Sequence, residues 1–422
     1  MRVLIVAEHA SAQFGGEAFL PLNYFRLLRE RQIDAWLVVH QRTQAELKSL
    51  FPDDSDRIQF VEDTWLHRVL WNVGKIFPQR LAVMTTGLIS HLYTQIIQRN
   101  IVRQIVQSNN IDVVHEPIPV SPKFPSLMFD VEAPVVIGPM NGDMSYPPGF
   151  AARQNWFVDL VLSVGRNLSE FGNRLMPGKL KAKVLLVANE RTKQALPQGS
   201  QGTVLKLVEN GVDLSVWQRN RQAQSPAVNQ AKTRFVFIGR LVDWKAVDLL
   251  LEAFSAVAAK SNVCLEIIGD GELRQQLEAL TVKLGLSEQV TFSGWLSQEQ
   301  CAVKLENADA LVLPSLLECG GAVVLEAMAV GIPVIATKWG GPVDYLNDSC
   351  GILIEPTSRE ALLEGFIEAM HKLAQNPQLR SQLGEAGKEL VRQHFDWERK
   401  IDSILEVYDL ATNIKTEKFE NV

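Results

Sequence analysis

The sequence predicts an α/β protein built from two doubly wound parallel sheets. Its 422 residues exceed the usual size of one domain and favour two, each large enough to bury its own core. Short apolar strands alternate with helical segments in two separate series, and a polar stretch at 218–233 separates these series. We therefore expect an N-terminal domain at 1–203, a C-terminal domain at 204–400 and a final helix at 401–422.

The first series opens as a parallel βαβ layer. It contains the strand RVLIVAEH, a turn at Gly15 and Gly16, a helix over EAFLPLNYFRLLRERQ and the strand DAWLVVH. Three later strands continue it: IDVVHE (111–116), PVVIGPM (134–140) and KVLLVAN (183–189). With helices between them, these strands form one doubly wound sheet.

The second series repeats the alternation after residue 233. Its strands are RFVFIGR, VCLEIIGD, VTFSGW, ALVLPS, PVIATK and GILIEP, separated by helical patterns such as those at 245–260 and 272–286. The amphipathic segment at 397–414 is long enough to cross back to the first domain. Ligands of open parallel sheets bind outside the carboxyl ends of the strands, so we expect the site in a cleft between the two domains.

Composition excludes several classes of protein. The net charge of −6 gives no global positive field for nucleic acid. The cysteines at 264, 301, 319 and 350 have neither zinc-site nor disulfide spacing, and they favour a reducing compartment. The N-terminus lacks the apolar core of a signal peptide, and the sequence has no run of about 18 apolar residues. We expect a cytoplasmic protein.

The strongest motif is LECGGAVVLEAMAVGIPVIATKWGGPVDYL at 317–346. Glu318, Gly320 and Gly321 lie between a predicted strand and a predicted helix, where bare backbone and a helix N-terminus favour a phosphate. Glu326 lies five residues beyond Gly321, about 7.5 Å along a helix, which approximates the span from a diphosphate to a ribose. The alternative is a helix-start acid and a solvated helix residue, although the apolar neighbours of Glu326 disfavour it.

Other strand ends carry complementary chemistry. Arg240 and Lys245 follow the strand RFVFIGR and would bring two positive charges to a departing diphosphate; the alternative is an exposed pair. Gly269 and Gly271 follow VCLEIIGD and would let backbone approach a nucleobase, although such a turn also ends a strand in many proteins.

These residues resemble the donor-binding signature of retaining glycosyltransferases with the two-domain GT-B fold, in particular family four. Glu318 is followed, after seven intervening residues, by Glu326, which opens the segment EAMAVGIPVIATKWGG. The segments FIGRLVDWKAVDLLLEAF, ENGVD and IIGDGELR resemble other parts of the family sequence. The resemblance covers nearly all of 204–400 and is much weaker in the N-terminal half. Ala322, Ala246 and Asp344 depart from common family residues; glycine is common at 246, and such changes leave donor identity open.

The resemblance implies two Rossmann-like domains facing a cleft, with the acceptor at the first and a nucleotide sugar at the second. It implies a hexosyltransferase reaction, in which a sugar moves to a hydroxyl acceptor with retention of its anomeric configuration. The reaction would belong to polysaccharide, glycolipid or cell-envelope glycan synthesis. The donor is expected to be a UDP- or GDP-sugar bound without a metal. Arg240 and Lys245 would stabilise the diphosphate, Glu318 would orient the sugar, and Glu326 would bind the ribose. Gly320, Gly321 and Ala322 would border the donor.

Candidate residues of the N-terminal half are fewer. Family members carry a glycine-rich loop near Gly15 and Gly16 and a histidine over the donor sugar near His115; an ordinary turn and a buried, hydrogen-bonded histidine are the alternatives. Asn141 and Asp143 could meet an acceptor hydroxyl, or form only a polar turn. The D-x-D at Asp54 and Asp56 lies in a polar loop, and we do not interpret it as a metal site.

Residues 64–111 contain no Asp or Glu but carry the cations Arg68, Lys75, Arg80, Arg99 and Arg103 among aromatic and apolar residues. This mixture suits an anionic bilayer surface and a lipid-linked acceptor at the inner face of the membrane. Helices packed on the N-terminal sheet are the alternative. Two other functions also stay open on the same fold: a nucleotide-sugar epimerase and a non-catalytic protein that binds sugar nucleotides.

Overall fold

The computed structural model describes residues 1–14, 16–76, 83–153, 169–217 and 232–413. The chain divides into two compact units. The first comprises the described residues within Met1–Asp143, Leu160–Glu209 and Ile401–Val422, and the second those within Met144–Asp159 and Asn210–Lys400. The segment that begins at Met144 therefore belongs with the second unit, a grouping that the strand pattern does not indicate.

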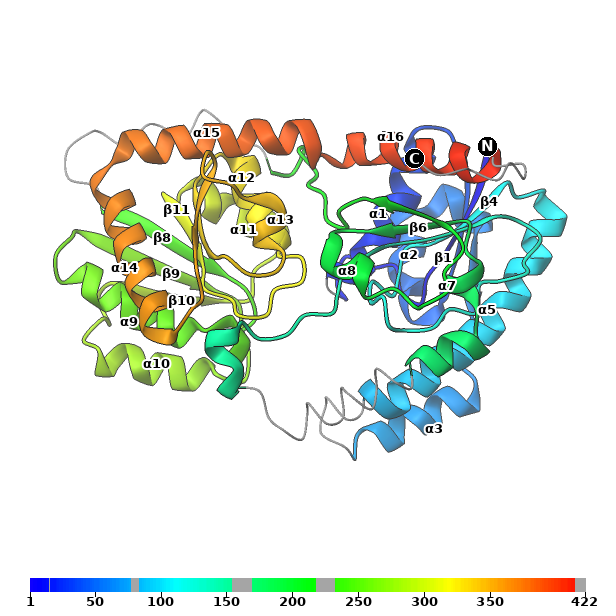
Figure 1. The fold of residues 1–422 in the computed structure, drawn as a ribbon, viewed down its shortest axis with the longest axis horizontal. Helices are drawn as coiled ribbons and strands as arrows, with labels where there is room; N and C mark the ends of the chain where they lie inside the picture. The colour runs from blue at the N-terminus through cyan, green and yellow to red at the C-terminus, as the bar shows by residue number, and fades with distance from the viewer. Residues whose placement is uncertain (15, 77–82, 154–168, 218–231, 414–422) are drawn as a thin grey trace. The chain divides into compact units, whose positions relative to one another are not determined.

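The first unit contains a seven-stranded parallel sheet in the order β3-β2-β1-β4-β5-β6-β7 (Figure 1). Its strands are β1 (Arg2–Val6), β2 (Asp34–His40), β3 (Ile58–Val61), β4 (Val113–Glu116), β5 (Val135–Met140), β6 (Val184–Val187) and β7 (Thr203–Lys206). Leu4 of β1 lies beside Trp36 of β2 and Val114 of β4. Both faces of β1 are buried from Val3 to Val6, which explains the apolar run of these four residues.

Helices and short turns connect these strands. They are α1 (Gly16–Glu30), η1 (Gln41–Thr43), α2 (Gln44–Leu50), η2 (Pro52–Arg57), α3 (Trp65–Gly74), η3 (Val83–Gly87), α5 (Leu88–Asn109), α7 (Gly178–Lys181) and α8 (Glu190–Gln194). The Thr64 hydroxyl caps α3, and Asn110 ends α5 in the left-handed conformation. Because α5 packs on β1, β2 and β3, it delivers side chains to the carboxyl ends of these strands.

The second unit contains a six-stranded parallel sheet in the order β10-β9-β8-β11-β12-β13. Its strands are β8 (Thr233–Ile238), β9 (Val263–Ile268), β10 (Val290–Gly294), β11 (Ala310–Leu313), β12 (Val334–Thr337) and β13 (Gly351–Ile354). The chain runs outward from β8 through β9 to β10, then returns to β11 beside β8 and runs outward again. The order therefore reverses between β8 and β11.

Helices cover both faces of this sheet. They are η5 (Asp243–Lys245), α9 (Val247–Ala258), α10 (Arg274–Lys283), α11 (Gln298–Glu306), α12 (Ala322–Val330), α13 (Pro342–Tyr345), α14 (Arg359–Gln375) and α15 (Pro377–His394). Figure 1 shows α9, α10 and α14 on one side of the sheet and α11, α12 and α13 on the other. The helix α16 (Trp397–Asn413) begins in the second unit and continues in the first. A short turn, η4 (Pro148–Arg153), belongs to the second unit.

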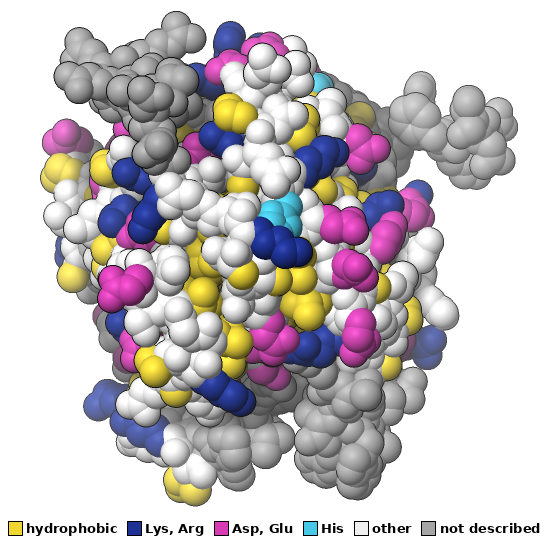
Figure 2. All heavy atoms as spheres, turned by 90° about the vertical axis from the view of Figure 1, so that its left-hand side faces the viewer, with side chains coloured by type: hydrophobic (Ala, Val, Ile, Leu, Met, Phe, Trp, Pro, Cys, Tyr) yellow, Lys and Arg dark blue, Asp and Glu magenta, His cyan; other side chains and the backbone are white. Residues whose placement is uncertain are grey.

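The predicted class of two doubly wound parallel sheets is confirmed. The strands β3 and β7 were absent from the prediction, and each lies at an edge of its sheet. On the face of the molecule in Figure 2, Lys, Arg, Asp and Glu side chains are interspersed. Such mixing agrees with a chain of small net negative charge.

Candidate functional site

The second unit has its topological switch point between β8 and β11. Ligands of doubly wound sheets bind where the strand order reverses, just beyond the carboxyl ends of the two strands. Here β8 leads into η5, and β11 leads into the loop before α12. The backbone N–H of Leu316 in that loop donates to the Trp244 carbonyl of η5 over 2.8 Å, which joins the two connections.

An ion pair lies across this switch point. The Lys245 ammonium of η5 donates to Oε2 of Glu318, the residue that the sequence placed before α12. Their side chains are only 13% and 12% exposed, so the pair is largely shielded from water. Two residues 73 positions apart were predicted to serve the same ligand, and the fold brings them into contact. Arg240 does not join the pair: it is exposed, with its guanidinium 5.6 Å from the Trp244 ring.

The two glycine pairs of the motif pack against each other. A Cβ on Gly341 would overlap the carbonyl oxygen of Gly320, and a Cβ on Gly340 would overlap that of Glu318. The Gly341 N–H donates to the same Glu318 carbonyl over 2.7 Å. Backbone-to-backbone contact of this kind excludes side chains, so glycine here fixes the loop that carries Glu318.

Gly269 and Gly271 have a similar role beside β8. A Cβ on Gly269 would overlap the Gly239 carbonyl, and one on Gly271 would overlap the Leu241 carbonyl. Gly269 also has a φ of +131°, which L side chains rarely adopt. These glycines hold the β8 and β9 connections together, and their predicted contact with a nucleobase stays a prediction.

The helix α12 presents Glu326 from a mostly apolar surface. Its N-cap, Gly321, is left-handed (φ 73°) and makes no side-chain cap, and Ala322 is its first residue. Glu326 is half-buried, and this burial raises the pKa of its carboxyl group from 4.5 to about 7. A solvated helix residue, the alternative interpretation of Glu326, does not fit that environment.

His115 in the first unit has the environment of the alternative interpretation, a buried and hydrogen-bonded histidine, and its placement over a donor sugar stays a prediction. Its side chain is 0% exposed. Nε2 donates to the Gly138 carbonyl over 2.6 Å, and Nδ1 accepts from the Tyr408 hydroxyl over 2.7 Å. Burial lowers the pKa of His115 to about 4, which keeps the ring neutral. Both ring nitrogens are therefore engaged inside the protein.

Asn141 is likewise committed to the interior. Its amide donates to Glu209 over 2.9 Å, and its carbonyl oxygen accepts from Arg191 over 2.9 Å. The side chain is thus buried and paired, and the predicted contact between Asn141 and an acceptor stays a prediction. Asp143 is exposed with a φ of 57°. Gly16 begins α1, and Gly15 lies outside the described residues.

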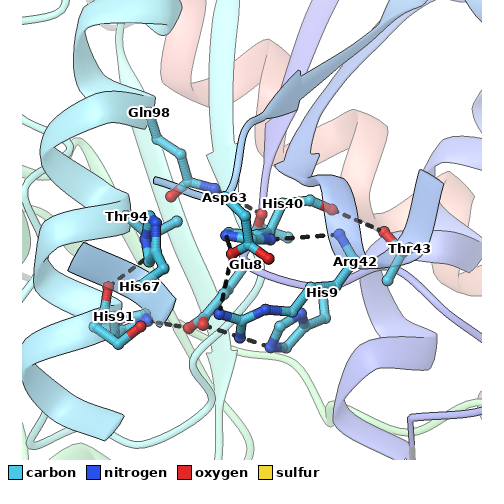
Figure 3. A network of polar contacts seen from close by, with 12 residues as sticks. Glu8, His9, His40, Arg42, Thr43, Asp63, His67, His91, Thr94 and Gln98 are labelled. Carbon is cyan, nitrogen blue, oxygen red and sulfur yellow. Dashed lines mark hydrogen bonds and ion pairs between the residues drawn. The ribbon is translucent and has the colours of Figure 1, made fainter. Parts of the chain in front are cut away.

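The sequence analysis missed a cavity at the corresponding switch point of the first unit, between β1 and β4. This β1–β4 cavity has a volume of about 320 Å³. Its polar lining comes from Glu8, His9, Glu17 and His91, and its apolar lining includes Phe14 and Phe124. Glu8 and His9 directly follow β1, a position that could have marked them, whereas His91 reaches the cavity from α5 (Figure 3).

One group of metal-ligating type occurs among the described residues: His40, Asp63 and His67, whose ligand atoms lie within 4.8 Å of one another (Figure 3). Both nitrogens of His67 have partners, since Nδ1 accepts from the Thr64 N–H over 3.2 Å and Nε2 lies 3.0 Å from the Thr94 hydroxyl. The Arg42 guanidinium lies 3.6 Å from Asp63 and opposes a second cation there. As arranged, the group supports α3 and α5 by hydrogen bonding.

Of the described residues in the segment 64–111, which was predicted to contact a bilayer, those of α3 and just beyond it carry the most exposed aromatic and apolar side chains. Arg99 and Arg103 donate to the carbonyls of Phe129 and Asp130, and Arg80 lies outside the described residues. In contrast, Trp65, Trp71 and Ile76 are 71%, 64% and 79% exposed, and Lys75 lies over the Trp71 ring. Within the described parts of the chain, the helices lack the combination of length and hydropathy needed to span a membrane.

Asp54, the first residue of the D-x-D, has a structural contact. Asp54 forms an ion pair with Arg29 over 2.8 Å and lies 4.0 Å from Arg57, all within the first unit. This arrangement gives Asp54 a role in holding α1 to η2.

Comparison with solved structures defines the fold. The fold is similar to that of a glycosyltransferase from Rickettsia africae, with a TM-score of 0.67, 16% identity and coverage of 98% of this chain and 99% of that chain. HepE from Anabaena in complex with UDP gives a TM-score of 0.64 at 15% identity, covering 96% of this chain and 99% of that chain. WaaG, a glycosyltransferase involved in lipopolysaccharide biosynthesis, gives a TM-score of 0.62 at 17% identity, covering 97% of this chain and 100% of that chain. The protein therefore has the GT-B fold.

Sequence comparison assigns one domain of the chain to a family. Residues 218–390 match the family "Glycosyl transferases group 1", and the chain carries a domain of that family. The lipopolysaccharide core biosynthesis glycosyltransferase LpsE of Rhizobium meliloti is 34% identical over 171 residues, 40% of this chain and 48% of LpsE. A D-inositol 3-phosphate glycosyltransferase of Rhodococcus jostii is 27% identical over 294 residues, 63% of this chain and 64% of that protein. The chain spans about half the length of the first curated relatives that it matches.

Proposed function

We propose that this protein is a retaining glycosyltransferase that moves a sugar from a nucleoside diphosphate donor to a hydroxyl acceptor in glycan synthesis. The observation that carries the proposal is the shielded Lys245–Glu318 pair at the switch point of the unit that matches the glycosyltransferase family. A switch point is where doubly wound sheets bind nucleotides, and a cation there suits a diphosphate.

The roles follow from the chemistry of each group. Lys245 has three N–H donors, so it can keep one bond to Glu318 and give the others to a departing diphosphate. Arg240 adds a second positive charge from the same loop. Glu318 orients the donor sugar, and Glu326 accepts hydrogen bonds from the ribose hydroxyls. The leaving phosphate takes the proton of the acceptor, so the reaction needs no dedicated protein base.

The donor is a UDP- or GDP-sugar bound without a metal ion. One observation supports uridine as the first choice of nucleobase, and a second supports binding without a metal ion. HepE, which shares the fold, has been solved with UDP and with UDP-glucose. The second unit also supplies its own cations beside the switch point, where a metal would otherwise neutralise the phosphates.

The acceptor is a glycan or a lipid-linked glycan at an anionic membrane surface. LpsE, a relative, is named for lipopolysaccharide core biosynthesis. The exposed tryptophans of α3, next to Arg68 and Lys75, have the composition of a helix that lies in a bilayer interface. This surface would bring the enzyme to its acceptor.

The decisive experiment screens nucleotide sugars for release of nucleoside diphosphate, with and without glycan acceptors. A donor that is consumed with formation of a new glycosidic bond supports the proposal, and the anomeric configuration of the product tests retention. An isomerised sugar nucleotide in the absence of acceptor would indicate an epimerase instead. Binding without any turnover would indicate a non-catalytic sugar-nucleotide protein.

Matched variants localise the activity. Lys245→Ala should lower turnover by about two orders of magnitude, because a charge-assisted hydrogen bond in a shielded site contributes ~1.5–3 kcal/mol. The exposed Lys260→Ala and Glu288→Gln variants, on the same unit, should retain full activity. Normal turnover in Lys245→Ala would contradict the assignment.

Membrane attachment is tested by sedimentation with vesicles of anionic and of zwitterionic lipid. We expect binding to anionic vesicles that weakens with salt, since ions screen the cations of α3. Replacement of Trp65 and Trp71 by serine should abolish it. Equal binding of this double variant would refute the role of α3.

A further inference from the structure

The second unit contains a segment that comes from the connection between two strands of the first sheet. The strands β5 and β6 both belong to the first sheet, yet the chain passes from the first unit to the second between Asp143 and Met144. Residues 144–150 form a strap that packs with the unit whose residues 218–390 match the glycosyltransferase family. The contacts of the strap explain this placement.

The far end of the strap is fixed to the loop that follows β13. Phe150 is 4% exposed, and its N–H donates to the Pro147 carbonyl over 2.8 Å, so the strap ends in a tight turn with a buried ring. A Cβ on Gly149 would overlap the carbonyl of Thr357. Backbone therefore packs directly on backbone at this point, and the attachment depends on the missing side chain of glycine.

The near end of the strap contacts the loop that packs on Glu318. The indole N–H of the half-buried Trp339 donates to the Ser145 carbonyl over 2.8 Å, which gives this donor the partner that a partly buried indole needs. A Cβ on Gly340 would overlap both the terminal methyl of Met144 and the carbonyl of Glu318. The strap and the loop that carries Glu318 therefore meet at one point, over Gly340.

We propose that the strap positions Glu318: it holds the loop at Trp339 and Gly340, and this loop holds the backbone of Glu318. The last link is the Gly341 N–H, which donates to the Glu318 carbonyl over 2.7 Å. The inference rests on the proposed function in one respect: Glu318 orients the donor sugar, so the strap sets the rate of sugar transfer and not the affinity for the nucleotide. Trp339 and Met144 are positioning residues, because they act through Glu318.

Kinetics of the full chain test the positioning role. Trp339→Phe keeps the aromatic ring and removes the N–H that bonds to the strap. We expect about fivefold lower kcat, the effect of one neutral hydrogen bond, with the donor KM and the affinity for UDP or GDP unchanged. Met144→Ala should act in the same direction, and Met144→Leu, which keeps an apolar side chain over Gly340, should retain the wild-type kcat. Unchanged kcat in Trp339→Phe, or a loss confined to KM, would overturn the proposal.

The contact itself is tested without turnover, in the full chain labelled with ¹⁵N-tryptophan. The signal missing from Trp339→Phe identifies the Trp339 indole, whose N–H should exchange slowly with solvent because Ser145 accepts it. Gly149→Ala, which detaches the far end of the strap, should speed this exchange about tenfold. The matched control is Gly172→Ala, whose new Cβ makes only ordinary contacts, and it should leave the exchange unchanged.

Fast exchange of the Trp339 indole in the wild type would overturn the proposal, as would equal exchange in the wild type and Gly149→Ala. Trp339→Phe changes no backbone contact, so its kinetics decide the matter if Gly149→Ala does not fold. A protected indole in a protein that transfers no sugar would contradict only the proposed function.

Discussion

Glu326→Gln should make the free protein more stable and its donor binding weaker. The carboxyl group has a pKa of about 7 in the folded protein, against an ordinary value of 4.5. Between these two values the folded protein holds a proton that the unfolded chain has lost. The free energy of unfolding therefore falls as the pH rises from 4.5 to 7, and the full cost is present above pH 7.

The structure gives the size of this cost. A rise from 4.5 to about 7 corresponds to at most ~3.5 kcal/mol, at roughly 1.4 kcal/mol for each pKa unit. Glutamine has nearly the same shape and stays neutral, so it should recover most of that energy at pH 8 and little at pH 5. For a unit of this size, each kcal/mol raises the melting temperature by ~2–4 °C.

The assay is thermal unfolding of both proteins at pH 5 and pH 8, with the exposed Glu288→Gln as the matched control. Affinity is then measured at pH 8 for the nucleoside diphosphate that stabilises the wild type most. We expect Glu326→Gln to bind it about 10–100-fold more weakly, since hydrogen bonds to a charged acceptor contribute ~1.5–3 kcal/mol. A stability difference that is the same at both pH values would refute the burial argument, and unchanged affinity would remove Glu326 from the donor site.

Four further predictions follow from named contacts. Ala246→Gly should stabilise the second unit by up to ~1 kcal/mol in chemical denaturation, because Ala246 is left-handed (φ 48°); a loss of stability would contradict this. His115→Ala should cost ~3–5 kcal/mol of unfolding free energy, since it leaves a cavity and unpairs Tyr408, yet turnover per folded molecule should persist; selective loss of turnover would restore a role in the site. Gly341→Ala should reduce donor turnover, because the new Cβ displaces the loop that carries Glu318, and wild-type kinetics would argue against that packing. Removal of divalent ions with EDTA should leave turnover unchanged, whereas a loss reversed by zinc would direct attention to the cluster around Asp63.

The fold was predictable where strands are buried on both faces. Val3 to Val6 of β1 form a continuous apolar run because helices cover both sides of the sheet, and β11 and the first three residues of β12 are apolar for the same reason. The edge strands differ. Thr203 and Lys206 of β7 are exposed, and the exposed Gln59 interrupts β3, so neither strand has the continuous apolar run that marks a central strand. Such strands form because a neighbour offers free backbone groups, which their own sequence does not show.

Part of the candidate site was predictable from the same reasoning. Parallel strands end at one edge, so residues that follow β8 and β11 had to converge once both strands were assigned. That logic brought Lys245 and Glu318 together before any contact was known. The same reasoning selected His115, which lies near the carboxyl end of β4, but a strand position does not reveal what packs over the side chain. Tyr408, 293 residues later, occupies its Nδ1.

The contrast between Lys245 and His91 shows why some contacts can be predicted from the sequence and others cannot. Lys245 reaches its partner through short connections that the local sequence defines, and the glycines of those connections permit the close approach. His91 meets Glu8 only because α5 docks at one particular angle and register on β1, β2 and β3. Docking of a helix depends on the summed packing of its whole face, in which a single histidine has little weight. A site assembled from strand ends is therefore accessible from sequence, whereas a site completed by a docked helix requires the three-dimensional structure.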